Sequence, residues 1–289
     1  RGVLGGPPHP TLRDLWTEED EEDVRAFLSA VTEDDLLGAL TAVEGSPASI
    51  RFEDTAQVEA WAAVAVRRLT VLPTKGPFAL SRLLRGLLVD EIGLKGDADD
   101  YSATRNCCLH QVLSRRKGMP ILLSCVWMEV GRRAGIPVEG IGMPGHFLVR
   151  VGGAAGVHVD TFAGGQELSR EGCRSLHDRI AGTKSRWSDD FLRPNTIDQV
   201  LERVLNNLAA TTREENDAAG SYRVATFLAA LRPLSPERTL QKAITAAAIG
   251  VTEEAASGFA DVIERFPDSP EAERASQGLD SLAAGTTVN

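Results

Sequence analysis

The stretch GMPILLSCVW (residues 118–127) has the composition of a buried helix and of the turn that precedes it. Pro120 suits the first helical turn, because a residue there needs no partner for a backbone N–H. The residues after it are apolar on nearly every side, and a helix with that pattern packs inside a protein core. The sequence therefore predicts a buried helix beginning near Pro120, the second of two helical pieces in residues 106–134 that break at Lys117–Gly118.

Two strand-like runs follow this helix. HFLVRV (residues 146–151) and GVHVDTF (residues 156–162) are rich in β-branched and aromatic residues, and a Gly/Ala turn separates them. Such a pair predicts an antiparallel hairpin. We interpret the intervening GIPVEGIGMPG (residues 135–145) as the segment that ends the helix. The middle of the chain is thus expected to be α+β, with one buried helix against a small antiparallel sheet.

The regions on either side of this core have helical patterns. The C-terminal part is rich in Ala and Leu, and RPLSPE (residues 232–237) returns as FPDSPE (residues 266–271) after 34 residues. That period is typical of tetratricopeptide repeats, with an ordinary helical hairpin as the alternative. We expect four segments: a flexible lead-in (1–16), an N-terminal helical region (17–100), an α+β core (101–194) and a tetratricopeptide-like helical region (195–289).

The overall charge and the cysteine pattern narrow the range of functions. The 289-residue chain has 41 acidic and 31 basic residues, a net charge of −10, which disfavours general binding to nucleic acid or to an anionic membrane. No apolar run approaches the roughly 18 residues of a membrane span. The four cysteines form no Cys-x-x-Cys pair and no metal-ligand array. We therefore expect reduced thiols, a cytoplasmic location, and neither a metal nor another cofactor.

His146 and Asp160 are the residues best placed for chemistry. His146 opens the first predicted strand and Asp160 comes late in the second, so a hairpin brings them together. A carboxylate in that position fixes the tautomer of an imidazole and stabilises its cation, as in a nucleophile–His–Asp arrangement. On spacing alone, a structural hydrogen bond is the commoner explanation of such a pair. His158 shares a strand face with Asp160, so a metal site with His146 is a further alternative.

The nucleophile of such an arrangement is harder to place. A thiol at the start of a buried helix gains from the positive end of the helix dipole, but Pro120 stands there. Ser124 lies one turn deeper, where a serine usually bonds to the helix backbone. Cys125 is rotated away among apolar neighbours, and Cys107 precedes the helix. Both are weak substitutes for a nucleophile.

Four motifs together resemble the SirB-type branch of the transglutaminase-like superfamily, over roughly residues 20–280. They are RNxxLxxVLxRRxGMPIxLS (105–124), AGIPVEGIGMPGHFLVRV (134–151), VDTFxGG (159–165) and LSREGC (168–173). The resemblance implies a transglutaminase/papain-like core with His146 and Asp160 at the positions of the superfamily's His and Asp. It also implies a nucleophile about fifteen residues before the Gly-Ile-Pro turn, and that position is Pro120.

Two functional hypotheses follow from these observations. The first is a non-catalytic module, a pseudoenzyme with a residual His/Asp cleft, that binds a protein or peptide partner through its C-terminal helices. Asn106 and Arg116 are candidate binding residues in the cleft, with helix capping and a solvated helix end as equal alternatives. The second is an enzyme that acts on an amide, ester or related acyl bond, or by His/Asp acid–base chemistry. A second copy of the chain is a further candidate partner.

Overall fold

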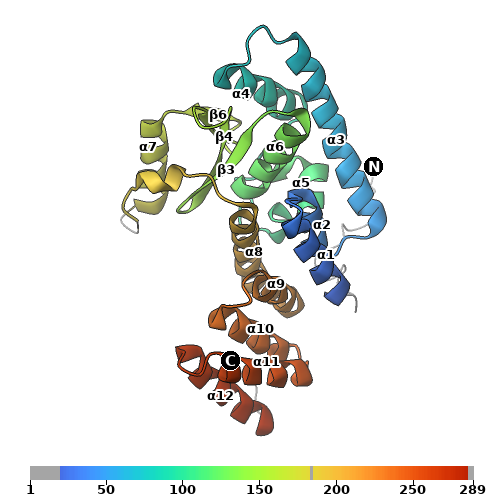
Figure 1. Cartoon of the computed structure of the whole chain (residues 1–289), viewed down its shortest axis with the longest axis vertical. Coiled ribbons are helices and arrows are strands. Elements are labelled where there is room, and N and C mark those ends of the chain that lie inside the picture. The colour runs from blue at the N-terminus through green and yellow to red at the C-terminus, as the bar shows by residue number, and fades with distance from the viewer. Residues whose placement is uncertain (1–19, 183–184, 286–289) are drawn as a thin grey trace, which may run out of the picture. The chain divides into compact units, whose positions relative to one another are not determined.

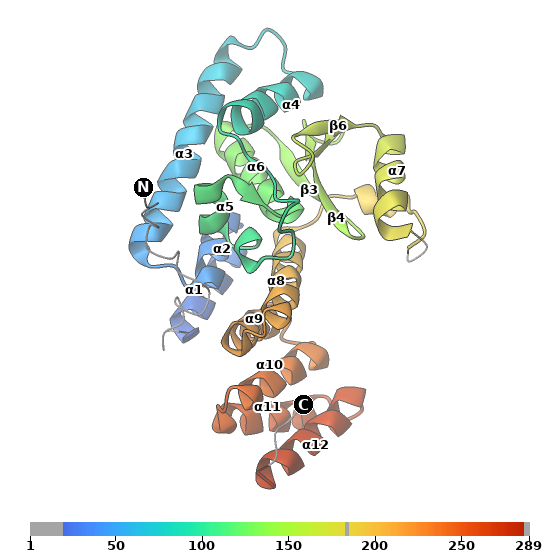
Figure 2. The same ribbon diagram turned by 180° about the vertical axis from the view of Figure 1, so that it is seen from behind.

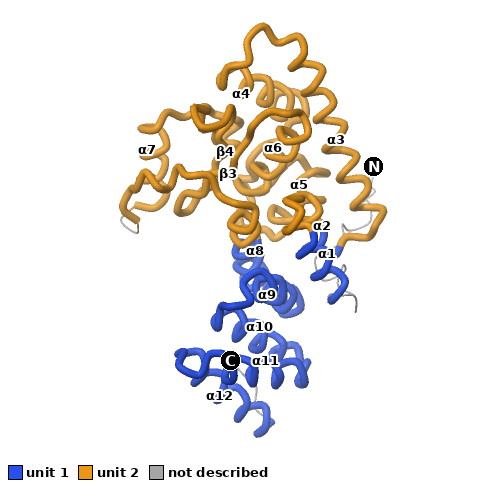
Figure 3. The backbone as a smooth tube through the Cα atoms, in the orientation of Figure 1, with its two compact units in different colours: residues 1–29, 42–45, 205–289 blue, residues 30–41, 46–204 orange. Residues whose placement is uncertain are grey.

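The computed structural model describes residues 20–182 and 185–285, which fall into two compact units (Figure 3). The core unit contains residues 30–41 and 46–204, and the helical unit contains the rest of the described chain. The expected lead-in, 1–16, lies outside the described residues. None of the described helices is long and apolar enough to cross a membrane.

The core unit is built around one helix and one sheet. Helix α6 (Pro120–Ala134) begins at the predicted proline and packs against two strands of a four-stranded antiparallel sheet (Figure 1). The strands pair in sequence order: β3 (Val138–Met143), β4 (His146–Val151), β5 (Val157–Asp160) and β6 (Gln166–Leu168). The buried helix and the small antiparallel sheet confirm the predicted α+β class.

Strand β3 was not predicted, because its VEGIGM sequence is glycine-rich and was interpreted as the end of the helix. The structure shows why the glycines belong in a strand. A Cβ atom on Gly140 would lie 2.9 Å from the ring of Phe147, and one on Gly142 would lie 2.6 Å from Oδ1 of Asn195. Both positions lack a side chain because neighbouring groups occupy that space.

The remaining elements of the core unit cover this sheet and helix. Figures 1 and 2 both show α6 between α3 and the strands. On the opposite face of the sheet, Cys173 and Leu176 of α7 join a buried cluster with Leu148 and its neighbours. The elements are α3 (Ala48–Val71), α4 (Pro77–Arg85) with a π-helical turn (Gly86–Glu91), β1 (Lys95–Gly96), a 3-10 turn (Thr104–Asn106), α5 (Leu109–Arg115), β2 (Lys117–Gly118), α7 (Arg170–Ala181) and a second 3-10 turn (Asp189–Leu192).

The helical unit contains RPLSPE and FPDSPE, the two similar segments that lie 34 residues apart. Its buried cluster joins α10, α11 and α12, with Phe259 fully buried at the centre. Ser235 and Ser269 cap α10 and α12 by accepting backbone N–H bonds, and a proline follows each. The two similar segments thus mark equivalent helix starts. That they belong to tetratricopeptide repeats stays a prediction. The helices are α9 (Ala218–Leu231), α10 (Pro236–Ala248), α11 (Thr252–Arg265) and α12 (Pro270–Ala283), while α1 (Asp20–Thr32), α2 (Leu36–Glu44) and α8 (Ile197–Glu214) contribute to both units.

Candidate functional site

His146 and Asp160 meet at adjoining ends of β4 and β5. The ladder pairs Val149 with Val159, so Asp160 continues opposite Leu148 and is a diagonal neighbour of His146. Nε2 of His146 lies 3.1 Å from Oδ1 of Asp160. The distance is that of an ion pair, but the alignment is poor, and Nε2 has no hydrogen-bond partner among the described residues. The two residues are buried, with 8% and 4% of their surfaces exposed.

The Asp160 carboxylate also shapes the backbone after β5. Its Oδ1 accepts hydrogen bonds from the backbone N–H groups of Phe162 and Ala163, each 3.1 Å long. This local bond pattern is one that aspartate forms readily in turns. The carboxylate that faces the imidazole is therefore held in place by the chain reversal that it stabilises.

Aromatic rings enclose the imidazole on one side. The ring of Phe162 packs edge-on against His146, with centroids 6.3 Å apart, and against Tyr101, with centroids 5.7 Å apart. Burial raises the pKa of the Tyr101 phenol; the charge of Cys107 adds to this rise, and the cation of Arg203 opposes it. Phe162 therefore contacts both the imidazole of His146 and the ring of Tyr101.

Arg203 of α8 fixes the turn that presents His146. Its Nη2 donates hydrogen bonds to the backbone carbonyl of Met143 and, at 2.7 Å, to that of His146. Its guanidinium also lies 5.6 Å from the Phe147 ring centre, and burial lowers its pKa. The sequence reasoning missed Arg203, which lies 57 residues from His146 in a segment assigned to the repeat region. The compact core unit extends through Val204 and so includes Arg203.

The start of α6 lies against the end of β5. The Thr161 hydroxyl is 3.3 Å from the Pro120 carbonyl oxygen and 3.0 Å from the Ser124 hydroxyl. Ser124 is fully buried and Thr161 nearly so. These bonds place Pro120 beside the strand that carries Asp160. They also give Ser124 a structural partner, so this helix end carries no free nucleophilic side chain.

All four cysteines are buried. Burial raises the pKa of Cys125 to about 12. Burial, together with the charge of Asp160, raises the pKa of Cys173 to about 11. Cys107 is 1% exposed, and its Sγ lies 2.9 Å from Sδ of Met119. Because the thiolate is the reactive form, Cys125 and Cys173 are poorly suited to attack an acyl group at neutral pH.

The two predicted binding residues have structural contacts. Asn106 is fully buried; its amide donates to the carbonyl of Asp100 at 2.6 Å and accepts from Arg115 at 3.0 Å. Arg116 ends α5 with a left-handed backbone, and its guanidinium stacks 4.7 Å above the Trp61 ring. Asn106 thus bonds to a loop carbonyl and to the Arg115 side chain, and Arg116 is half-buried against Trp61. A binding role for either residue stays a prediction.

The alternative metal site is not formed. In residues 20–182 and 185–285, no three His, Cys, Asp or Glu side chains lie close enough together to hold a metal ion. His158 pairs with Arg150 across the ladder, and burial, with this cation adding to it, lowers its pKa. His158 therefore does not join His146 and Asp160 in a ligand set.

Comparisons with known proteins show which proteins this chain resembles. Residues 54–206 match the family model described as the transglutaminase-like superfamily. A UPF0162 protein of Xylella fastidiosa is 32% identical over 186 residues, which are 63% of this chain and 66% of the relative. A UPF0162 protein of Pseudomonas aeruginosa is 34% identical over 197 residues, 67% of this chain and 65% of the relative. F-box only protein 21 of Mus musculus is 36% identical over 138 residues, 45% of this chain and 21% of the relative. The matches thus span just under two thirds of the two bacterial relatives, and no solved structure matches the chain.

Proposed function

We propose that this chain, which belongs to the transglutaminase-like superfamily, is a non-catalytic member that acts as a protein- or peptide-binding module. The observation that carries the proposal is the start of α6, where Pro120 stands at the position that the superfamily resemblance assigns to the nucleophile. His146 and Asp160 remain together on the neighbouring strands. The motifs quoted above support placement in the SirB-type branch.

The surroundings of the pair support a structural role for it. The Asp160 carboxylate stabilises the turn at Phe162 and Ala163, and the His146 carbonyl accepts a hydrogen bond from Arg203. These contacts hold the hairpin and the following turn in one arrangement without any nucleophile. A chain that has lost the thiol therefore still has a physical reason to retain both residues.

We place the proposed binding site for a protein or peptide partner in the helical unit. A groove of about 450 Å³ lies among α8, α9 and α10 and is lined by residues between Asn206 and Ala248. Its lining combines amides, such as those of Asn206 and Gln241, with apolar groups, such as those of Ala210 and Leu228, and with charged side chains: Arg213, Asp217, Glu237 and Arg238. Amides can bond to a peptide backbone while apolar side chains cover its alternate residues. This mixture suits a short peptide segment.

The test selects peptides from a displayed random library on the full chain and then measures their affinities for two variants. Ala210→Arg places a long cation in the groove, at an exposed helical position where arginine is tolerated. Glu264→Arg changes an exposed residue of α11 that does not line the groove. We expect Ala210→Arg to weaken binding at least about tenfold and Glu264→Arg to leave it unchanged. Failure to select any peptide, or equal losses in both variants, would refute the peptide-binding role.

The 3.1 Å contact between His146 and Asp160 favours one second candidate, an enzyme that uses this pair for acid–base chemistry on an acyl bond. It predicts hydrolysis of a small ester or amide by the full chain that is lost in His146→Ala while the fold persists. Unchanged hydrolysis in that variant, checked against a circular dichroism spectrum of the native type, would exclude it.

A further inference from the structure

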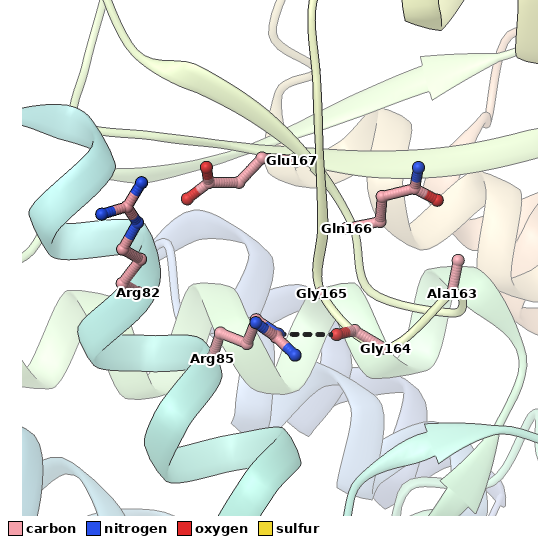
Figure 4. Close-up of a pocket in the computed structure, with 7 residues that line it drawn as sticks. All are labelled: Arg82, Arg85, Ala163, Gly164, Gly165, Gln166 and Glu167. Atoms are coloured by element: carbon pink, nitrogen blue, oxygen red, sulfur yellow. Dashed lines mark hydrogen bonds between the residues drawn. The ribbon is translucent and has the colours of Figure 1, made fainter.

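A second pocket lies in the core unit, on the side of α4. It has a volume of about 530 Å³ and is lined by Arg82 and Arg85 of α4 and by residues 163–167, which lead into and begin β6 (Figure 4). None of its lining residues belongs to the His146–Asp160 pair. Its polar side chains come from two elements that are distant in the sequence, so the fold assembles it.

The two arginines bring positive charge to one wall of the pocket. They are three residues apart on a helix and therefore point to the same side. Nε of Arg85 donates to the Gly164 carbonyl at 3.2 Å, and its Nη2 lies 3.6 Å from the exposed carboxylate of Asp90. Arg82 is exposed, and its guanidinium makes no hydrogen bond or ion pair within the described part of the chain. One guanidinium is thus positioned by the backbone, and the other is available to an anion.

Glu167 contributes a carboxylate to the pocket, and one of its oxygens accepts no hydrogen bond from the described residues. It lies on β6 opposite Val159, and Figure 4 shows its side chain pointing toward Arg82. Its Oε1 is buried, yet no group in residues 20–182 or 185–285 donates a hydrogen bond to it. Buried polar atoms are nearly always hydrogen-bonded, so an oxygen of this kind marks a place for a donor.

Two glycines keep the pocket open. Gly164 and Gly165 both have positive φ, at 67° and 72°. A Cβ atom on Gly165 would lie 3.0 Å from Cγ of Arg85 and 3.3 Å from the Trp127 ring. The Gly165 N–H donates to the Asp160 carbonyl at 2.9 Å, which ties this wall to the turn after β5. Gly165 therefore allows the backbone to lie close to the Arg85 side chain.

The charges select the chemistry of a ligand. Two guanidiniums favour a carboxylate or phosphate, while the buried oxygen of Glu167 requires an N–H or O–H donor. A phosphate group alone would be repelled by Glu167, and an amine alone would be repelled by the arginines. We infer that the pocket binds an α-amino acid, either free or as the C-terminal residue of a peptide. Its carboxylate would pair with Arg82 and Arg85, and the nitrogen on the same carbon would donate to Glu167. The inference is independent of the proposed groove, which lies in the helical unit.

Saturation-transfer difference NMR on the full chain tests the inference with four probes: a mixture of the twenty L-amino acids, a mixed tripeptide library with free carboxylates, the same library with C-terminal amides, and methyl phosphate, whose methyl protons report on phosphate binding. We expect signals from the free amino acids or the carboxylate library, whichever is the source of the ligand. The amide library and phosphate should give none. Absence of a signal from both carboxylate sources, or equal signals from the amides or phosphate, would overturn the inference.

Calorimetric titration of the ligand found in this way then locates the site. Arg82→Gln and Glu167→Gln should each raise the dissociation constant about tenfold or more, because each removes one charge-assisted hydrogen bond. Arg67→Gln and Glu59→Gln are matched controls, since both residues are exposed on α3 and neither lines the pocket. Unchanged binding in both pocket variants, or equal losses in the controls, would place the ligand elsewhere and refute the site.

Discussion

The start of α6 and the adjoining ends of β4 and β5 are neighbours in the fold, but they differ in the chemistry that they retain. The strands present His146 and Asp160 with 3.1 Å between Nε2 and Oδ1. The helix presents Pro120, whose carbonyl oxygen lies 3.3 Å from the Thr161 hydroxyl. The difference teaches that the scaffold does not depend on a nucleophile. A helix start needs a residue that tolerates the first turn, and proline does so.

The largest effect is expected from replacing Pro120, which tests whether the start of α6 is aligned with the His146–Asp160 pair. Pro120→Cys places a thiol at a helix N-terminus beside the strand that carries Asp160. The helix dipole should lower its pKa below the ordinary 8.5 or so. We expect iodoacetamide to label this thiol about a hundredfold faster than Cys125, whose pKa is about 12. Labelling of each thiol can be followed by peptide mass spectrometry.

The double variant Pro120→Cys with His146→Ala is the control, and it should lose about tenfold of that rate because the imidazole can no longer accept the proton of the thiol. An introduced thiol that reacts no faster than Cys125 would show that the helix start and the pair are not aligned. The two regions would then be independent features of the fold.

The next largest effect concerns the support of the hairpin. Arg203→Met removes the donor to the carbonyls of Met143 and His146 while keeping much of the side-chain volume. We expect the free energy of unfolding to fall by about 3 kcal/mol, since two partly buried carbonyls lose a charged donor. Urea unfolding measures this change in free energy, and Arg67→Met, at an exposed position of α3, is the matched control. A loss no greater than that of the control would mean that Arg203 does not hold the strand that carries His146.

The smallest expected effect is on the pH dependence of stability, and it comes from His158, which lies on the same face of the sheet as His146. His146 faces a carboxylate, whereas burial and the nearby Arg150 lower the pKa of His158 from 6.5. The folded chain therefore binds a proton at His158 less readily than the unfolded chain does. The contribution of neutral His158 to the free energy of unfolding is complete above pH 6.5 and is lost as the pH drops through the folded pKa. His158→Gln should flatten the decline between about pH 7.5 and 5.5, by at most about 1.4 kcal/mol per pH unit. Identical pH profiles for the two proteins would contradict this assignment.

Local patterns carried the parts of the fold that could be predicted. The helix at Pro120, the hairpin and the meeting of its His and Asp depend on periodicity and strand register over short distances. Strand β3 was missed because Gly140 and Gly142 are explained only by what packs against them. Arg203 was missed because its partners lie in β3 and β4, far from it in sequence. The pocket at Glu167 depends on α4 and β6 together, and no spacing in the sequence indicates that contact.

We expect the His146–Asp160 pair to have no working nucleophile, and the reactivity of the native thiols tests this expectation. The folded wild-type chain is treated with iodoacetamide at neutral pH, and the labelling rates of its four cysteines are compared with that of free cysteine and with those of the chain in urea. Because all four are buried, we predict that each reacts more slowly than free cysteine in the folded chain and quickly in urea. A single thiol in the folded chain, Cys107 above all, that reacts faster than free cysteine would contradict the account.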